Sequence, residues 1–395
     1  MRPVRVLQVV GDLDVGGGQE VVRTLARYLT EVDCSPVVVT LKDGPLRADL
    51  EESGITVEVL QGRTHSLAAL PSAIRELWQL RKALAAVVAR HRSEVIQTHL
   101  LRALDFLVLT LRAEPGVRRV FWTFHNARLD LRPDQLSAHA WLLKPKRVVY
   151  RLLYFVAGRS VDGFIAVSED VAAAVRRDFH PPRRRIFTIP NGVDTERYGQ
   201  LIDRTSVRER VGIPGDARVV IVVAKLMEQK GHVFLLRALP PILERYPDLH
   251  VLLVGDGPLR SSLTASIAEL RDAARVHLVG NRRDVSDLLA ASDLFVLPSL
   301  WEGLPMALLE AMASGLPPVV SRVSGAAEVV VDGESGLLVP AADVERLCAA
   351  IGVLLEDPDR ARRVGRAARE RVERFYSART QAARHAAIYH DTEAG

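Results

Sequence analysis

Apolar residues recur along the chain in short uninterrupted runs, and amphipathic segments with helical spacing separate these runs. In the first half the expected buried strands are 4–10, 35–41, 94–99, 118–125, 163–168 and 185–194. In the second half they are 217–226, 250–257, 275–280, 293–298 and 316–321. Continuous apolar strands that alternate with helices are typical of parallel sheets covered on both faces. The pattern therefore predicts a doubly wound α/β protein with two similar halves, joined near residues 191–201.

The length of 395 residues agrees with two domains, because a single hydrophobic core rarely grows beyond ~250–300 residues. The two cysteines are far apart, and no Cys/His spacing of the metal-site type occurs, so we expect a reducing compartment and no bound metal. The N-terminus lacks signal-peptide features, and no apolar run is long enough to span a bilayer, so we expect a cytoplasmic protein. Aromatic residues make up only 5%, which gives no indication of nucleic-acid binding.

Positive charge is concentrated in the first half of the chain. Residues 1–195 contain 28 Lys and Arg against 21 Asp and Glu, whereas the remainder is slightly acidic. A basic half favours an anionic partner, such as a phosphorylated lipid or the surface of an anionic membrane. The alternative is an ordinary solvated surface.

In open parallel sheets, ligands bind beyond the carboxyl ends of the strands. LWEGLPMALLE (300–310) follows the expected strand 293–298, and we expect a helix to begin at Pro305. Backbone N–H groups at the start of that helix, at Leu304, Met306 and Ala307, would form a phosphate site, which Gly303 allows a ligand to approach. Glu302 and Glu310 would accept hydrogen bonds from hydroxyl groups on either side of a diphosphate, as in a nucleotide sugar. The alternative is a strand–turn–helix unit with surface glutamates.

Further charged and glycine residues follow other strands. Lys225 and Lys230 follow the first strand of the second half, where they would neutralise a departing diphosphate, unless they are simply solvated lysines. Gly17 and Gly18 belong to the loop GDLDVGGGQE (11–20), which would let phosphate or sugar come close to the backbone. The loop lacks the last glycine of the G-x-G-x-x-G dinucleotide fingerprint, which disfavours a dehydrogenase.

Two histidines end expected strands in the first half. We assign His125 a functional role, in which it hydrogen-bonds a substrate hydroxyl or moves a proton, and His99 a structural role. Residues 140–159 combine basic and apolar side chains. They fit an interfacial helix on anionic lipid, but we favour a core helix that packs on the sheet through Leu152, Leu153, Phe155 and Val156.

Together these motifs resemble the family 4 glycosyltransferases. The resemblance covers nearly the whole chain, and its most specific part is the Glu-x7-Glu pattern of Glu302 and Glu310 within 298–339. The supporting motifs are the glycine-rich loop, TFHN (123–126), AVSE (166–169), IPNGVD (189–194), QKGH (229–232) and VGDGP (254–258). The chain departs from the family pattern in having Lys225 in place of an arginine and Ala378 in place of a tryptophan.

The resemblance implies a GT-B fold with two facing Rossmann-like domains. Residues 1–195 would bind the acceptor and 196–375 the nucleotide-sugar donor, and a helix near 376–395 would cross back to the first domain. It also implies metal-independent transfer of a hexose from a UDP-sugar or GDP-sugar, with retention of configuration, to a sugar or lipid-linked acceptor. Such reactions occur in bacterial polysaccharide or glycolipid assembly, and peripheral binding to an anionic membrane would suit such an acceptor.

The resemblance also implies a role for each candidate residue. Glu310 would hold the ribose and Glu302 the donor hexose, while the backbone at Gly303, Leu304 and Pro305 would support hexose and phosphate. Lys225 and Lys230 would contact the diphosphate, and His125 would lie near the reacting sugar. Gly17 and Gly18 would lie near donor phosphate or acceptor.

Three other functions remain open. Glu302 and Glu310 could be the carboxyl pair of a glycosidase, although that chemistry requires the two groups about 5–10 Å apart across the scissile bond. The same fold could support a sugar-nucleotide epimerase or hydrolase. A protein that binds nucleotide sugars without turnover is the third alternative.

Overall fold

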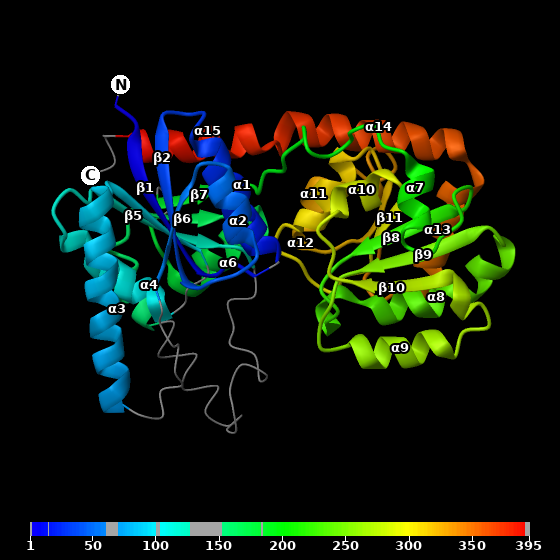
Figure 1. The fold of residues 1–395 in the computed structure, drawn as a ribbon, viewed down its shortest axis with the longest axis horizontal. Coiled ribbons are helices and arrows are strands. Elements are labelled where there is room, and N and C mark those ends of the chain that lie inside the picture. Colours follow the sequence, from blue (N-terminus) through cyan, green and yellow to red (C-terminus); the bar gives the residue numbers. More distant parts are fainter. Residues whose placement is uncertain are drawn as a thin grey trace. The chain divides into compact units, whose positions relative to one another are not determined.

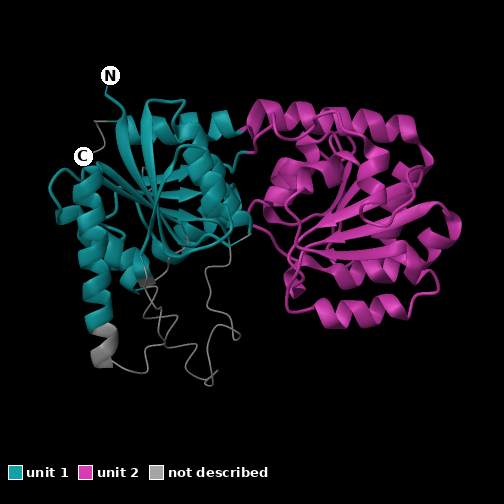
Figure 2. Cartoon of the chain, viewed as in Figure 1, with its two compact units in different colours: residues 1–192, 378–395 teal, residues 193–377 magenta. Residues whose placement is uncertain are grey.

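The computed structural model describes residues 2–14, 16–60, 70–99, 103–126, 152–182 and 185–391. The chain forms two compact units, shown in separate colours in Figure 2. Unit 1 contains residues 1–192 and 378–395, and unit 2 contains residues 193–377. The first unit is therefore completed by the last segment of the chain.

Unit 1 is built on a seven-stranded sheet in the order β3-β2-β1-β4-β5-β6-β7, with every neighbouring pair parallel (Figure 1). Its strands are β1 (Val4–Asp12), β2 (Cys34–Lys42), β3 (Thr56–Val59), β4 (Val95–His99), β5 (Arg119–Phe124), β6 (Gly163–Ala166) and β7 (Ile186–Thr188). The chain order reverses direction between β1 and β4, which are neighbours in the sheet. This reversal is the point at which open α/β sheets place their ligands.

The helices of unit 1 are α1 (Gly17–Leu29), α2 (Leu46–Glu52), α3 (Leu70–His91), α4 (Ala103–Leu109), α6 (Glu169–Phe179) and α15 (Ala378–His390), with a 3₁₀ turn, η1 (Thr110–Ala113). Apolar side chains of α1 and α15 pack together on β1, β4 and β5, and Leu25, Phe121 and Tyr389 belong to this buried cluster. Its position shows that α15 contributes to the core of unit 1 although it comes last in the sequence.

Unit 2 has a six-stranded parallel sheet in the order β10-β9-β8-β11-β12-β13. Its strands are β8 (Arg218–Val223), β9 (Leu249–Val254), β10 (Val276–Gly280), β11 (Leu294–Leu297), β12 (Pro318–Ser321) and β13 (Leu337–Val339). Its helices are α7 (Arg204–Glu209), α8 (His232–Arg245), α9 (Arg260–Ala268), α10 (Val285–Ala290), α11 (Met306–Ala313), α12 (Ser324–Val329), α13 (Val344–Glu356) and α14 (Pro358–Phe375), with 3₁₀ turns η5 (Glu228–Lys230) and η6 (Ala273–Arg275). Here the direction reverses between β8 and β11.

Local sequence explains where several of these helices begin. The hydroxyl of Ser168 accepts a hydrogen bond from the backbone N–H of Val171 at the start of α6. The carboxylates of Asp343 and Asp357 do the same for α13 and α14. Such caps satisfy N–H groups that have no partner within the helix, and each typically contributes about 1 kcal/mol.

The prediction of a parallel, doubly wound fold in both halves is confirmed, but it missed two strands. Both β3 and β13 are short and lie at an edge of their sheets. All four residues of β3 are exposed or only partly buried, and Glu58 lies in its middle. An edge strand needs no continuous apolar run, because its outer side has no neighbouring strand.

The core-helix prediction for residues 140–159 needs correction where the structure describes it. Residues 140–151 lie outside the described residues, and residues 152–157 are helical. Leu152 and Val156 are 60% and 59% exposed, so they do not pack on the sheet. Tyr154 is buried there instead and stacks on Phe179, with ring centroids 4.5 Å apart. The apolar spacing was assigned to the wrong face of the helix.

Candidate functional site

Two loops that follow neighbouring strands meet at the carboxyl edge of the unit 2 sheet. One follows β8 and contains Lys225 and Lys230, and the other follows β11 and contains Glu302. Because β8 and β11 flank the reversal of strand order, their carboxyl ends emerge side by side. The topology thus brings together residues that are 72 positions apart in the sequence.

Lys230 and Glu302 form an ion pair at this edge. The Lys230 Nζ lies 2.6 Å from Glu302 Oε1, and the hydroxyl of Ser299 donates to the same oxygen at 2.6 Å. Gln229 donates through Nε2 to the carbonyl oxygen of Trp301 at 2.8 Å and to Glu302 Oε2 at 3.4 Å. We call Gln229, Lys230, Ser299 and Glu302 the lysine–glutamate cluster.

The lysine–glutamate cluster is largely buried. The side chain of Glu302 is 5% exposed and that of Lys230 is 18% exposed. A charge withdrawn from water needs a partner, and each of these two groups supplies it to the other. The Lys230 ammonium has two further N–H bonds, and Glu302 Oε2 accepts only the long bond from Gln229 among the described residues. The cluster can therefore offer donors to an anion and an acceptor to a hydroxyl group.

Glycines allow the loops around this cluster to touch through their backbones. Gly231 has a φ of 64°, and a Cβ at this position would lie 2.0 Å from the carbonyl oxygen of Pro298. A Cβ on Gly325, the second residue of α12, would lie 1.8 Å from the carbonyl oxygen of Gly303. Contacts this close exclude any side chain. The loop 298–305 is thus held between its neighbours on both sides.

The helix that follows this loop starts one residue later than expected. Pro305 has extended backbone angles and is the N-cap of α11, whose first residue is Met306. The Pro305 carbonyl accepts a hydrogen bond from Leu309. Leu304 and Glu310 are buried, at 5% and 7% exposure. Glu310 is the fifth residue of α11, so it lies just over one turn beyond the helix start.

Lys225, a predicted diphosphate contact, and Arg282, a further basic residue, follow other positions at the carboxyl edge of this sheet. Lys225 is exposed and follows β8 by two residues. Arg282 follows β10 and donates two hydrogen bonds, of 2.9 and 2.8 Å, to the carboxylate of Asp284. The guanidinium of Arg282 is therefore oriented by its own loop.

In unit 1 the glycine-rich segment is partly helical, which corrects the prediction of a loop up to residue 20. Gly16 is the extended N-cap of α1, and Gly17 and Gly18 are its first two residues. The N–H of Glu20 donates to the Gly16 carbonyl at 2.9 Å, which closes the first turn. Asp12, at the end of β1, accepts a hydrogen bond of 2.7 Å from Gln19 and so ties the strand to the helix start.

His125 lies at the carboxyl edge of the same sheet, directly after β5. Its Nε2 lies 3.2 Å from Nδ1 of His99, and His99 Nε2 lies 2.6 Å from Oε1 of Gln8. The Gln8 amide donates to Tyr389 at 3.2 Å, and Tyr389 donates to Gln97. Gln97 in turn donates to the Thr123 hydroxyl at 2.7 Å. The two histidines assigned separate roles are directly connected.

Burial changes the protonation of these histidines. Desolvation, aided by the charge of His385, lowers the pKa of His125 to about 4. Desolvation and the neighbouring histidines also hold the pKa of His99 well below its usual value. Both rings are therefore neutral at neutral pH, and His125 suits hydrogen bonding better than the delivery of a stored proton.

Sequence analysis missed the partners of the candidate residues. Gln229 and Ser299 complete the lysine–glutamate cluster, and Gln8, Gln97 and Tyr389 complete the network around His99 and His125. A signal for two of them was present, since Gln8 and Gln97 are amide side chains in the middle of runs read as buried strands. Buried amides need partners, so they indicate a polar network.

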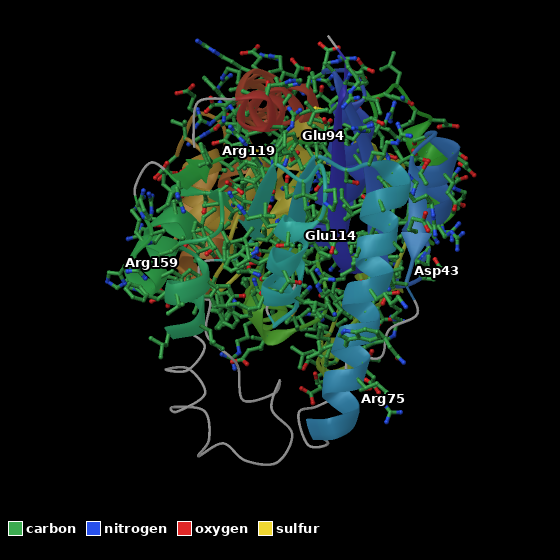
Figure 3. The ribbon with its side chains drawn as sticks, turned by 90° about the vertical axis from the view of Figure 1, so that its left-hand side faces the viewer. Asp43, Arg75, Glu94, Glu114, Arg119 and Arg159 are labelled. Carbon is green, nitrogen blue, oxygen red and sulfur yellow. The ribbon has the colours of Figure 1, made fainter. Side chains whose placement is uncertain are left out.

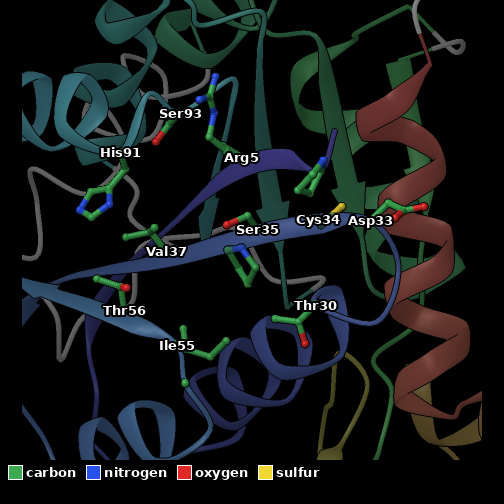
Figure 4. Close-up of a pocket in the computed structure, with 13 residues that line it drawn as sticks. Arg5, Thr30, Asp33, Cys34, Ser35, Val37, Ile55, Thr56, His91 and Ser93 are labelled. Atoms are coloured by element: carbon green, nitrogen blue, oxygen red, sulfur yellow. The ribbon is translucent and has the colours of Figure 1, made fainter. Parts of the chain in front are cut away.

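A cavity of about 500 Å³ lies at the opposite edge of the unit 1 sheet (Figure 4). It is lined by residues at the amino ends of β1, β2 and β3, among them Arg5, Cys34 and Thr56. Since the candidate residues of unit 1 lie at the carboxyl ends of the strands, this cavity is not part of their site. Within the described ranges, no group of three or more His, Cys, Asp or Glu side chains is arranged to hold a metal ion.

Two family profiles match the chain. The profile described as "Glycosyltransferase Family 4" matches residues 15–197, and "Glycosyl transferases group 1" matches residues 203–371. The two matches correspond to the two α/β halves of the chain.

Curated relatives agree with these profiles. An MMP alpha-(1->4)-mannosyltransferase from Mycolicibacterium hassiacum is 31% identical over 316 residues, which cover 77% of this chain and 72% of the relative. A UDP-Gal:alpha-D-GlcNAc-diphosphoundecaprenol alpha-1,3-galactosyltransferase from Escherichia coli is 31% identical over 218 residues. That second alignment spans 54% of this chain and 56% of the relative's length.

Solved structures extend the likeness of fold to the whole chain. The crystal structure of Anabaena HepE in complex with UDP and glucose superposes with a TM-score of 0.80 at 20% identity. It covers 98% of this chain and 99% of the Anabaena chain. At this identity the superposition establishes a common fold.

Proposed function

The chain belongs to the family 4 glycosyltransferases and has the GT-B fold, and from this premise we propose that it transfers a hexose from a UDP-sugar or GDP-sugar to an acceptor hydroxyl. We further propose that the configuration at the anomeric carbon is retained. Unit 2 would bind the donor, and unit 1 would bind the acceptor.

The observation that carries the proposal is the pairing of Lys230 with Glu302 beside the start of α11. A nucleotide sugar presents sugar hydroxyls next to a diphosphate. Glu302 Oε2 would accept a hydrogen bond from a hexose hydroxyl, and the remaining N–H bonds of Lys230 would contact the diphosphate. Fixed donors near the leaving group stabilise the negative charge that develops as the glycosyl bond breaks.

The other candidate residues have roles consistent with their positions. Lys225 is exposed and would supply a second cation to the diphosphate, which together with Lys230 would make a divalent metal unnecessary. Glu310 would hold the ribose, and the backbone at Gly303, Leu304 and Pro305 would support hexose and phosphate. Gly17 and Gly18, at the start of α1, would contact donor phosphate or acceptor, and His125 would hydrogen-bond the reacting sugar.

We also propose a lipid-linked or polysaccharide acceptor and peripheral binding at the inner face of an anionic membrane. The name of the E. coli relative includes a sugar linked to diphosphoundecaprenol, which is a lipid. Trp78 on α3 is 62% exposed, and the Lys82 ammonium lies over its ring. Val156 is 59% exposed, and the guanidinium of Arg159 lies over the ring of the neighbouring Phe155. Figure 3 shows Arg75 and Arg159 on the outside of this unit. Exposed apolar groups beside cations suit the surface of an anionic bilayer. No helix in the described ranges has the length and apolar character to cross a membrane.

The first experiment identifies the donor. The protein is screened by thermal shift against UDP, GDP, ADP and their sugars, since a ligand at 100 times its Kd stabilises the native state by about 2.7 kcal/mol. Sugar transfer from the stabilising donor to lipid-linked and oligosaccharide acceptors is then measured in excess EDTA. Nuclear magnetic resonance of the anomeric proton in the product reports retention or inversion.

Each alternative function gives a different result in these assays. Cleavage of a simple glycoside without nucleotide would indicate a glycosidase. Conversion of the donor without acceptor would indicate an epimerase or hydrolase, and stabilisation without turnover would indicate a binding protein. Loss of transfer in EDTA would contradict metal independence alone.

A further inference from the structure

Polar side chains from three strands of unit 1 lie on one face of an otherwise apolar sheet. In the parallel register Gln8 is paired with Gln97, and His99 is paired with Thr123. Paired residues of neighbouring strands point to the same face, and so do residues two positions apart. The face that carries Gln8 and His99 therefore also carries His125. It is the face that α15 covers, where Tyr389 packs among the buried residues of β1 and β5.

These side chains form a continuous chain of hydrogen bonds with a defined direction. Gln97 accepts from the Tyr389 hydroxyl through its oxygen and donates through its nitrogen to Thr123. Gln8 donates through its nitrogen to the Tyr389 oxygen, which leaves its own oxygen to face His99 Nε2 at 2.6 Å. The orientation of the Gln8 amide is thus fixed by a residue 381 positions later in the sequence.

The direction of this chain determines which nitrogen of each histidine carries the proton. Burial keeps both rings neutral, so each ring has one N–H and one bare nitrogen. His99 donates from Nε2 to the Gln8 oxygen, and its Nδ1 is therefore an acceptor. Nδ1 of His99 faces Nε2 of His125 at 3.2 Å, so His125 donates from Nε2 and its own Nδ1 is bare.

That last nitrogen has no partner among the described residues. His125 is 8% exposed, and its Nδ1 is a buried atom without a hydrogen bond. A buried acceptor left without a hydrogen bond destabilises the native state, because it has lost its bonds to water and gained none in return. The native structure keeps the Nδ1 acceptor of His125 unpaired, whereas the five other members of the network are hydrogen-bonded. This contrast indicates that a group of a bound ligand donates to Nδ1.

We propose that Gln8, acting through His99 and held by Tyr389, fixes His125 in the Nε2–H tautomer, so that Nδ1 accepts a hydrogen bond from a substrate hydroxyl group. The inference rests on the proposed function only for the identity of the hydroxyl, which would belong to the donor sugar or the acceptor. Gln8, His99 and Tyr389 are positioning residues, because they act on the substrate through His125.

The tautomer is measured directly on the full-length protein labelled with ¹⁵N-histidine. Two-bond ¹H–¹⁵N correlation at pH 7.5 distinguishes protonated from bare ring nitrogens, and the His125→Asn variant assigns the His125 signals. We expect Nε2–H for both His99 and His125, and the Nδ1 signal of His125 should move when the stabilising nucleotide sugar is added. The Nδ1–H tautomer for His125 would mean that both glutamine amides point the other way, and it would overturn the proposal.

Variants of the network separate positioning from packing. Gln8→Met keeps the volume but removes the acceptor, and Tyr389→Phe removes the hydroxyl that holds the Gln8 amide. We expect both to give a mixture of His125 tautomers and to lower kcat, about tenfold for Gln8→Met, while the donor KM changes less than twofold. The matched control is Gln381→Met, because Gln381 is 3% exposed on α15 but lies outside the network. It should leave the tautomer and kcat unchanged.

The outcomes distinguish this proposal from the proposed function. A wild-type tautomer and kcat in Gln8→Met would overturn the positioning role while leaving glycosyl transfer intact. Equal losses in Gln8→Met and Gln381→Met would show a packing effect and would also overturn it. If no acceptor supports turnover, the tautomer and its ligand-induced shift remain measurable, so the proposal can still be decided.

Discussion

The ammonium group of Lys230 lies 2.6 Å from the carboxylate of Glu302, although the two residues come from loops that follow different strands. The contact exists because β8 and β11 are neighbours at the point where the strand order of unit 2 reverses. Ser299 donates to the same carboxylate oxygen, and the side chain of Gln229 holds the loop at Trp301. Both charges of the proposed donor site are therefore positioned before any ligand binds.

Removing one charge of this pair should affect stability and activity in separable ways. Lys230→Met leaves the Glu302 carboxylate buried without its cation, so we expect about 3 kcal/mol of destabilisation and a loss of kcat of about 100-fold or more. The double variant Lys230→Met/Glu302→Gln no longer has the uncompensated charge, so it should regain most of the stability but not the kcat. Urea unfolding and steady-state kinetics of the single and double variants measure both effects. A double variant as active as wild type would contradict the role of Lys230 in stabilising the departing diphosphate.

Glu310 should act mainly on the nucleotide. Hydrogen bonds to a charged group typically contribute about 1.5–3 kcal/mol, so Glu310→Gln should weaken nucleotide binding by about 10- to 100-fold. The kcat at saturating donor should change much less, because the ribose takes no part in bond breaking. Isothermal titration with the nucleotide and a KM–kcat comparison test this, with the exposed Glu334→Gln as control. Unchanged nucleotide affinity would refute the ribose assignment.

The contact between Gly325 and Gly303 should tolerate no side chain. A Cβ at position 325 would lie 1.8 Å from the Gly303 carbonyl oxygen, so Gly325→Ala must displace the loop 298–305. We expect a loss of about 1–3 kcal/mol and weaker donor binding. Gly352→Ala is the matched control, since the nearest atom to its Cβ would be 3.8 Å away within α13, where alanine is favoured. Equal stability of the two variants would show that the loop is not held in this way.

Stability should fall as the pH drops below 6.5. Desolvation lowers the pKa of His125 and His385 to about 4, so the unfolded chain takes up protons between pH 6.5 and 4 that the native state does not. Each such proton lowers the free energy of unfolding by about 1.4 kcal/mol per pH unit within this window. The pKa of Glu58, hydrogen-bonded by His91, lies below its usual 4.5, so its contribution is lost only at lower pH.

Urea unfolding of the full-length protein at several pH values from 7.5 to 4.7 measures this dependence. The variant His385→Gln, which removes one titrating ring, should reduce the slope by about one proton. A free energy of unfolding that stays constant across this range would contradict the neutral, buried state of these histidines.

The long apolar runs were sufficient to predict the parallel sheets, because a strand buried on both faces must be apolar along its whole length. They were insufficient for β3 and β13, which lie at sheet edges and need less apolar sequence. For residues 152–157 the apolar spacing correctly predicted a helix, but it did not show which side of the helix is buried. Tyr154 is buried there, and Leu152 is exposed.

The sequence by itself determined the fold class, the family and the candidate residues Glu302, Glu310, Lys225, Lys230 and His125, because each of these depends on residue type and local spacing. Only the tertiary structure decided which of them are partners. It joined Lys230 to Glu302 and connected His125 to Gln8 through His99. Strand order and the return of α15 to unit 1 set those contacts, and both arise from burying apolar surface between segments that are distant in the chain.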